Sequence, residues 1–253
     1  MIRRFVFWVL LWWCLTGIAA ESLPVTPRER YILKFELRGT GQVFPEEWYC
    51  RGDELDYPGV AIRFLDKDGQ AVPVLPFSNF HVAFSTEFIP GEISFYAPDN
   101  AASVEVSGKN AEFRNLQLEK VPSSLQVSID LDHRVSGTFR RTVFTPAEDN
   151  MTVFDTSASY IYCSPIPVRP GEKYRLTVSG RRSERSETVI RVWFFRDSLN
   201  NRQSLIGRNH SPLRVGGAKE NFEYIFTVPQ GTGWVRVTFM WGIIWNYRME
   251  KVD

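Results

Sequence analysis

The residues best suited to acid–base or metal chemistry are few and scattered in this chain. The three histidines, His81, His133 and His210, stand far apart and do not form the His-x-x-x-His spacing of a metal site. The sequence also contains no Gly-x-Ser-x-Gly nucleophile turn and no glycine-rich phosphate loop. We therefore expect a protein that is not an enzyme, and the sequence leaves open whether it binds a metal.

Acidic and aromatic side chains gather in one stretch, residues 39–59. Its acids could include the paired carboxylates of a glycosidase, although acids crowded into one exposed loop are more often simply solvated: Glu46, Glu47, Asp53, Glu54 and Asp56. Its aromatic residues are Trp48, Tyr49 and Tyr57. Loops this long in compact domains are usually functional or disordered, and the rings favour a function. The alternative is that the rings only cover the open end of a sandwich.

The elements that position these residues come from a pattern that occurs twice. Residues 95–98, 104–106 and 115–121 match residues 226–229, 235–237 and 246–252 at a constant spacing of 131 (226 minus 95). Residues 23–31 match residues 166–174 at a spacing of 143 (166 minus 23). The spacings differ by 12, so the first copy carries a net insertion, which falls within 39–59. Two copies at this period predict two related domains rather than a solenoid.

Both copies show the period of two that is typical of half-buried strands. In the first copy, apolar residues alternate with polar ones along 31–37 and 60–64. Asp66-Lys67-Asp68-Gly69 resembles part of a calcium loop, but a hairpin turn explains it better because no acidic ligand follows at loop spacing. Since no long stretch has helical periodicity, we predict an all-β protein with two tandem β-sandwich domains, residues 21–121 and 122–253, after a signal peptide.

Strand alternation in the second copy separates core residues from outward-facing rings. Ile190, Val192 and Phe194 form an apolar set, which places Trp193 and Phe195 on the opposite face. Trp234 likewise lies opposite Val235 and Val237, and we expect all three of these opposite-face rings to be exposed. Trp241 and Trp245 share the parity of core residues, so they are predicted to be buried.

The N-terminus has the features of a secretory signal. Arg3 and Arg4 precede a short apolar run and a small-residue exit, which predicts cleavage after Ala20. The alternative is an uncleaved anchor. We expect a secreted, periplasmic or extracellular protein with no membrane contact after cleavage. The chain has 30 basic and 29 acidic residues and no basic cluster, so we expect no nucleic-acid partner.

Two cysteines, Cys50 and Cys163, remain outside the signal. In an exported protein an even pair favours a disulfide, which here would join the two predicted domains. The alternative is two separate buried thiols.

Residues 170–178, Pro-Gly-Glu-Lys-Tyr-x-Leu-x-Val, and the closing strand ending in Glu250-Lys251-Val252 resemble the galactose-binding-like, jelly-roll β-sandwiches. The likeness is greatest to the CenC-type carbohydrate-binding modules of bacterial cellulases and xylanases. It covers residues 164–253 well and 22–121 more loosely. The resemblance implies glycan binding through aromatic side chains and a structural calcium ion, and no other cofactor is expected. Unlike those enzymes, this chain shows no catalytic domain.

We therefore predict a secreted, non-catalytic protein that binds a glycan or polysaccharide. Exposed aromatic rings, rather than a charged site, are expected to carry the affinity: Trp48, Tyr49, Tyr57, Trp193, Phe195 and Trp234. The alternative is an extracellular or envelope module for protein–protein interaction or structure, in which the same rings anchor a protein partner.

Overall fold

The computed structural model confirms the all-β prediction. It describes residues 21–41, 48–49, 58–75, 80–83, 85–122, 126–129, 134–135, 143–146, 152–155, 160–162, 165–182, 189–199, 203–211, 220–240 and 242–252. All regular elements in these ranges are strands that pair antiparallel. Within them we find no helix with the length and apolar character needed to cross a bilayer.

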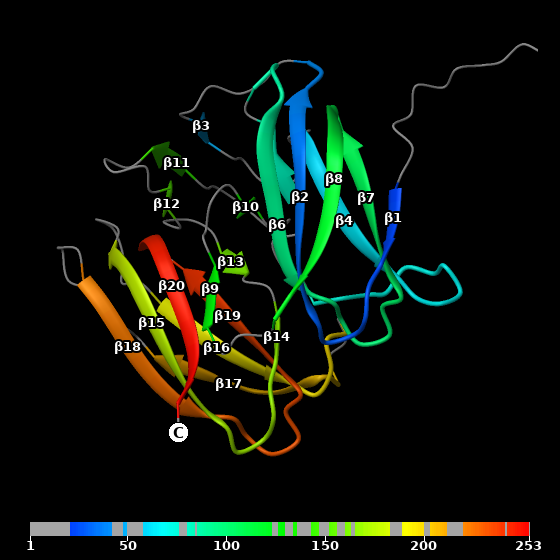
Figure 1. Cartoon of the computed structure of the whole chain (residues 1–253). Helices are drawn as coiled ribbons and strands as arrows, with labels where there is room; N and C mark the ends of the chain where they lie inside the picture. Colours follow the sequence, from blue (N-terminus) through cyan, green and yellow to red (C-terminus); the bar gives the residue numbers. More distant parts are fainter. Residues whose placement is uncertain are drawn as a thin grey trace, which may run out of the picture.

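The strands of the first copy lie in two sheets, at the upper right of Figure 1. One sheet has the order β6-β2-β8, formed by Ile89–Tyr96, Arg30–Gly39 and Ala111–Val121. The other begins β1-β7-β4-β5, formed by Glu21–Pro24, Ser103–Lys109, Gly59–Leu65 and Phe80–Val82. Their facing side chains form one apolar cluster that includes Leu33, Ile62 and Phe95. This pairing of two inner faces is the arrangement of a β-sandwich.

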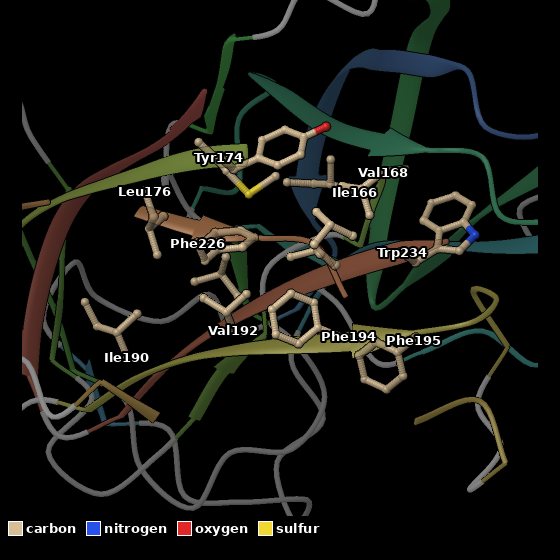
Figure 2. Close-up of a cluster of buried hydrophobic side chains, with 14 of the residues drawn as sticks. Ile166, Val168, Tyr174, Leu176, Ile190, Val192, Phe194, Phe195, Phe226 and Trp234 are labelled. Atoms are coloured by element: carbon tan, nitrogen blue, oxygen red, sulfur yellow. The ribbon is translucent and has the colours of Figure 1, made fainter. Parts of the chain in front are cut away.

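The second copy repeats these neighbours. One sheet contains β18-β15-β20, formed by Glu220–Thr227, Lys173–Arg182 and Gly242–Val252, with β12 (Thr152–Asp155), β11 (Val143–Pro146) and β9 (Gln126–Ile129) added. The other has β13-β19-β16-β17, formed by Tyr160–Tyr162, Trp234–Met240, Val189–Phe195 and Leu205–Ser211, and β14 (Ile166–Pro167) pairs with β19. Figure 2 shows the cluster between these sheets, with Val192, Phe194 and Phe226 among its members.

Equivalent aromatic residues pack in the same way in both cores. Tyr31 and Phe95 stack with ring centroids 5.9 Å apart, and Tyr174 and Phe226 stack at 5.9 Å. Phe64 meets Phe95 edge-on at 5.2 Å, and Phe194 meets Phe226 edge-on at 5.7 Å. The predicted inward sets are buried in both copies. The aromatic residues that match between the two copies are therefore core positions with the same packing in both sandwiches.

The Asp66–Gly69 segment forms the predicted hairpin turn. The Asp66 carboxylate accepts hydrogen bonds from the backbone N–H groups of Asp68 at 2.9 Å and Gln70 at 2.8 Å. Gly69 adopts φ 76°, where a residue without Cβ is unstrained. The carboxylate therefore stabilises its own turn.

Two short strands cross from one copy to the sheet of the other. β3 (Trp48–Tyr49), from the insertion, pairs with β11 in a sheet of the second copy. In the opposite direction, β10 (Arg134–Val135) pairs with β5 in a sheet of the first copy. The division of the chain at residue 122 stays a prediction, because each predicted domain contributes a strand to the other.

Candidate functional site

One face of the β17-β16-β19 sheet combines an aromatic ring with several cationic side chains. Because Ile190, Val192 and Phe194 point into the core, the alternate residues of β16 project on the other side. Strand register then places Trp193 between Arg208 of β17 and Arg236 of β19, and Arg191 beside Thr238. We call these residues the arginine–tryptophan face: Arg191, Trp193, Arg208, Arg236 and Thr238.

The two arginines flank the indole ring closely. The Arg208 Cζ lies 5.2 Å from the Trp193 ring centroid, and the Arg236 Cζ lies 6.0 Å from it. The Arg236 Cζ also lies 5.3 Å from the Phe195 ring. Cations at these distances from an aromatic face are attracted by its quadrupole. The packing therefore holds the guanidinium groups next to the ring.

The residues of the arginine–tryptophan face differ in their exposure to solvent. Arg208 is exposed and Trp193 half-buried, whereas Arg236 is 7% exposed and Thr238 is 0% exposed. Within the described part of the chain, the Trp193 Nε1 and the Thr238 Oγ1 have no hydrogen-bond partner. Buried polar atoms are normally hydrogen-bonded, and both of these atoms are shielded from solvent, so a ligand would reach them only by displacing neighbouring groups.

The described residues supply no constellation for bond-breaking chemistry on this face. They also contain no group of three or more His, Cys, Asp or Glu side chains that could hold a metal ion. The calcium ion implied by the resemblance stays a prediction. What the arginine–tryptophan face can do is stack on an apolar surface and donate hydrogen bonds.

Two of the predicted ligand-binding rings are buried, which corrects their assignment as exposed. Phe195 is 4% exposed and Trp234 is 0% exposed. Figure 2 shows Phe194 and Phe195 on opposite sides of β16, as strand alternation predicts, yet both rings belong to the same buried cluster as Trp234. The expectation was wrong because other parts of the chain cover this end of the sheet.

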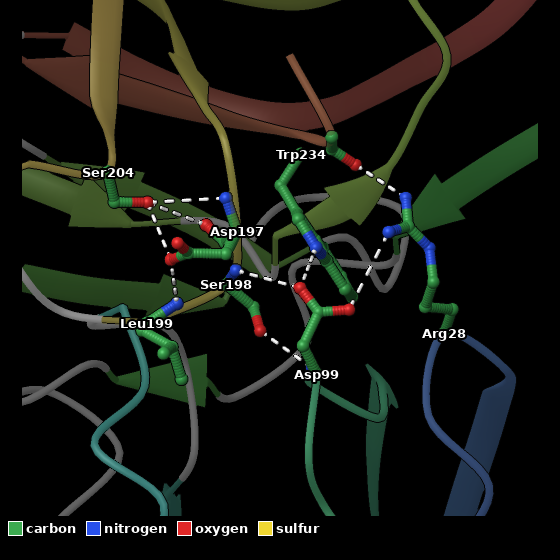
Figure 3. A network of polar contacts seen from close by, with 8 residues as sticks. Arg28, Asp99, Asp197, Ser198, Leu199, Ser204 and Trp234 are labelled. Atoms are coloured by element: carbon green, nitrogen blue, oxygen red, sulfur yellow. Dashed lines mark hydrogen bonds and ion pairs between the residues drawn. The ribbon is translucent and has the colours of Figure 1, made fainter. Parts of the chain in front are cut away.

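Trp234 anchors a contact between the two copies (Figure 3). Its Nε1 donates a hydrogen bond of 2.6 Å to the Asp99 carboxylate in the first copy. Arg28 completes the contact, since its Nη2 donates to the Gly233 carbonyl at 2.8 Å and its Nη1 lies 3.6 Å from Asp99. We call Arg28, Asp99, Ser198, Gly233 and Trp234 the inter-copy clamp.

Backbone contacts extend the inter-copy clamp. The Asp99 N–H donates to the Ser198 hydroxyl at 2.7 Å, and the Leu75 N–H donates to the Ser198 carbonyl at 2.9 Å. Val74 and Leu199 form an isolated antiparallel bridge. Leu75 and Tyr96 of the first copy pack in the apolar cluster of the second. Burial raises the pKa of the Tyr96 hydroxyl, so this residue stays neutral at the junction.

The remaining predicted site residues receive only partial description. Trp193 takes the outward position predicted for it. Trp48 and Tyr49 form β3, which pairs with Phe144 and Val143 of β11, and only their backbone is described. Tyr57, Cys50, Cys163, Trp241 and residues 1–20 lie outside the described residues, as does the Trp245 side chain. The predicted disulfide and signal cleavage stay predictions.

Sequence reasoning missed the four residues that surround Trp193 on the arginine–tryptophan face. One signal was available: the match between residues 104–106 and 235–237 pairs Glu105 with Arg236, a change of charge inside two otherwise similar strands. Arg208 gave no such signal, because only strand pairing brings it beside Trp193.

Comparisons with known proteins do not place the chain in a family. No family model and no curated protein matches it. Among solved structures, it is similar to the tandem CBM22-1–CBM22-2 domain of Paenibacillus barcinonensis Xyn10C, with 11% identity over 91% of this chain and 82% of that chain and a TM-score of 0.32. It is also similar to accessory secretory protein 1, 2 and 3 of Streptococcus pneumoniae, with 10% identity over 44% of this chain and 86% of that chain and a TM-score of 0.32.

A third solved structure, the isomalto-dextranase of Arthrobacter globiformis T6 in complex with panose, is 8% identical over 91% of this chain and 36% of that chain, with a TM-score of 0.36. At TM-scores below 0.5, these likenesses identify neither a family nor a ligand.

Proposed function

We propose that the protein is an exported, non-catalytic glycan-binding protein whose binding surface is the arginine–tryptophan face. The observation that carries this proposal is the half-buried Trp193 held between Arg208 and Arg236, with its Nε1 free of partners among the described residues. Sugar rings present C–H groups that pack on an indole, and their hydroxyls accept hydrogen bonds from neighbouring donors. A ring with placed polar groups around its edge is the usual form of such a site.

Single stacked rings bind weakly, at about 1 kcal/mol each. Weak binding is useful when the ligand is a polymer, because repeated units raise the effective concentration.

The test is retention on insoluble polysaccharides. We expect Trp193→Ala to lose retention, because it removes the stacking surface and leaves the inward residues Ile190, Val192 and Phe194 of β16 in place. Ile225→Ala is the matched control, since Ile225 is 50% exposed on β18 of the other sheet and should be dispensable. Trp48→Ala tests separately whether β3 contributes. Equal retention of wild type and Trp193→Ala would contradict the proposal.

A protein partner is the second candidate, and one observation favours it. β17 is the end strand of its sheet in the described topology, and its Leu205 is 43% exposed. An end strand offers unpaired backbone groups to an extended segment of another protein. Retention on no glycan, together with a partner whose binding is lost in Leu205→Asp, would favour this function instead.

A further inference from the structure

At one pair of matched positions, equivalent sheets of the two copies carry different side chains: an ion pair in the first copy, and an aromatic ring beside an arginine in the second. In the first copy, Arg63 of β4 pairs in register with Glu105 of β7, and their side chains form an ion pair at 2.8 Å. In the second copy, the equivalent register pair is Trp193 with Arg236. The position of the Glu105 carboxylate is thus taken by the Arg236 guanidinium, and that of Arg63 by the Trp193 indole.

Two arginines of the arginine–tryptophan face, Arg191 and Arg208, form no ion pair with a carboxylate in the part of the chain that the structure describes. The Arg191 Nε is buried and has no hydrogen-bond partner in that part. Holding unpaired cations near a low-dielectric surface costs free energy. An anionic ligand would recover it.

The hydrogen-bonding groups of this face also favour an anion. An indole N–H and a guanidinium are donors only, and the face contributes one indole and three guanidinium groups. The Thr238 hydroxyl is 0% exposed, so only the exposed Arg208 and the half-buried Arg191 and Trp193 can meet a ligand without rearrangement. A set dominated by donors is best satisfied by a ligand rich in acceptors, and carboxylate and sulfate groups are acceptors without a competing donor.

We propose that the arginine–tryptophan face binds an anionic glycan, with a sugar ring packed on Trp193 and its carboxylate or sulfate group bound by the neighbouring guanidinium groups. This inference rests on the proposed glycan-binding function and names its ligand class. Guanidinium groups bind carboxylate and sulfate through two parallel N–H donors, a geometry that an ammonium group does not reproduce. Binding should weaken as salt is added, because screening reduces the charge attraction.

The experiment is affinity electrophoresis of the exported protein in gels that contain polygalacturonate, dextran sulfate or uncharged dextran. We expect retardation by one or both of the anionic polymers and little by dextran. The first two polymers separate carboxylate from sulfate as the recognised group. Poly-glutamate serves as an anionic polymer without sugar rings, and it should retard the protein less than the preferred polysaccharide.

Three variants locate the binding. Arg208→Ala should weaken binding by about tenfold or more, the effect expected for loss of a charge-assisted hydrogen bond. Arg208→Lys keeps the charge and should still bind more weakly than wild type. Arg175→Ala is the matched control, because Arg175 pairs with Glu223 on the other sheet at 3.3 Å. Since Arg208 is exposed, thermal unfolding of its variants should match wild type.

The outcomes separate the two proposals. Equal binding to dextran and to the anionic polysaccharides overturns the anionic specificity and leaves glycan binding intact. Binding to poly-glutamate as strong as to the anionic polysaccharides, or full binding by Arg208→Ala, also overturns it. Binding to no polysaccharide overturns the proposed function itself. Selective binding that Arg208→Ala loses and Arg175→Ala retains supports both.

Discussion

The two copies build the same turn from different residues. In the second copy, Gly171 takes the left-handed conformation at φ 83°, and its N–H donates to the Val228 carbonyl at 2.9 Å. In the first copy, Arg28 takes that conformation at φ 66° and donates to the Ala97 carbonyl at 2.7 Å. The backbone hydrogen bond is the same, although a left-handed conformation costs a residue with a Cβ about 1–2 kcal/mol.

Arg28 offsets this cost through its side chain. Its guanidinium reaches the Gly233 carbonyl and lies 5.2 Å from the Trp234 ring, both in the other copy. Gly171 has no side chain and makes no such contact. The shared strands therefore determine the backbone conformation of the turn. Which residue occupies its left-handed position depends on the contacts that the side chain has to make. Five predictions test which parts of the structure the two copies share and which contacts belong to one copy alone.

The largest effect should come from the shared aromatic cores. Phe95→Ala removes a buried ring that meets two others, and Phe226→Ala removes one that meets three, so each should lower the free energy of unfolding by about 3–5 kcal/mol. Urea unfolding followed by tryptophan fluorescence measures both. Phe113→Ala, at a half-buried position outside the aromatic pairs, is the milder control. A cost below about 1 kcal/mol in either copy would show that the frames are not equivalent.

At the inter-copy clamp, substitutions at matched positions of the two copies should have different effects on stability. Asp99→Ala leaves the buried Trp234 N–H without its acceptor and should cost about 1–3 kcal/mol. The matched residue 131 positions later is Gln230, which is exposed, so Gln230→Ala should change stability by about 0.5 kcal/mol or less. Differential scanning calorimetry gives both values. Equal effects at the two positions would contradict a role of Asp99 in joining the copies.

Gly233 and Ala102 sharpen the comparison further, because they occupy matched positions. A Cβ added at Gly233 would lie 2.4 Å from the Arg196 carbonyl oxygen, so Gly233→Ala forces backbone to move and should cost about 1–3 kcal/mol. Ala102 already carries a Cβ, and Ala102→Ser should be close to neutral. Thermal unfolding compares the two variants. A Gly233→Ala protein as stable as wild type would mean that the turn after β16 adjusts freely.

The smallest expected effect is a pH dependence specific to the second copy. Partial burial raises the pKa of Glu172, but hydrogen bonds from Lys251, the Arg169 N–H and the Tyr174 hydroxyl outweigh it and leave that pKa below 4.5. A lowered folded-state pKa contributes stability above that pH and loses it as the pH falls. Wild type should therefore lose more melting temperature on acidification from about pH 5 to pH 3 than Glu172→Gln does. Parallel slopes for the two proteins would exclude this contribution.

At alkaline pH, a second group in the same copy should make stability depend on pH, because its pKa is raised in the folded state rather than lowered. Burial, followed by the hydrogen bond to Glu172, raises the pKa of Tyr174 above 10.0. Ionisation of the unfolded chain should therefore destabilise the fold as the pH rises past that value, and Tyr174→Phe should reduce the loss.

Strand faces were predictable from sequence, and what covers them was not. Alternation assigned Ile62 and Phe64 to the interior and Trp193 to the opposite side, as the structure has them. The same rule could not distinguish Trp193 from Trp234, because it describes one strand and contains nothing about packing between sheets. Trp234 is buried and donates its hydrogen bond to Asp99, which lies 135 residues away in the chain. Contacts at that separation have no local signal.

The exchange of β3 and β10 bears on how the chain is made. A nascent chain emerges from its N-terminus, and β5 acquires its partner β10 only after residues 134–135 have been synthesised. Until then, one border of the first sheet has open backbone groups that invite pairing with another molecule. Separate expression of residues 21–121 would make this exposure permanent, and β11 would lose β3 in the complementary fragment. The two halves are therefore better produced and stored as one continuous polypeptide.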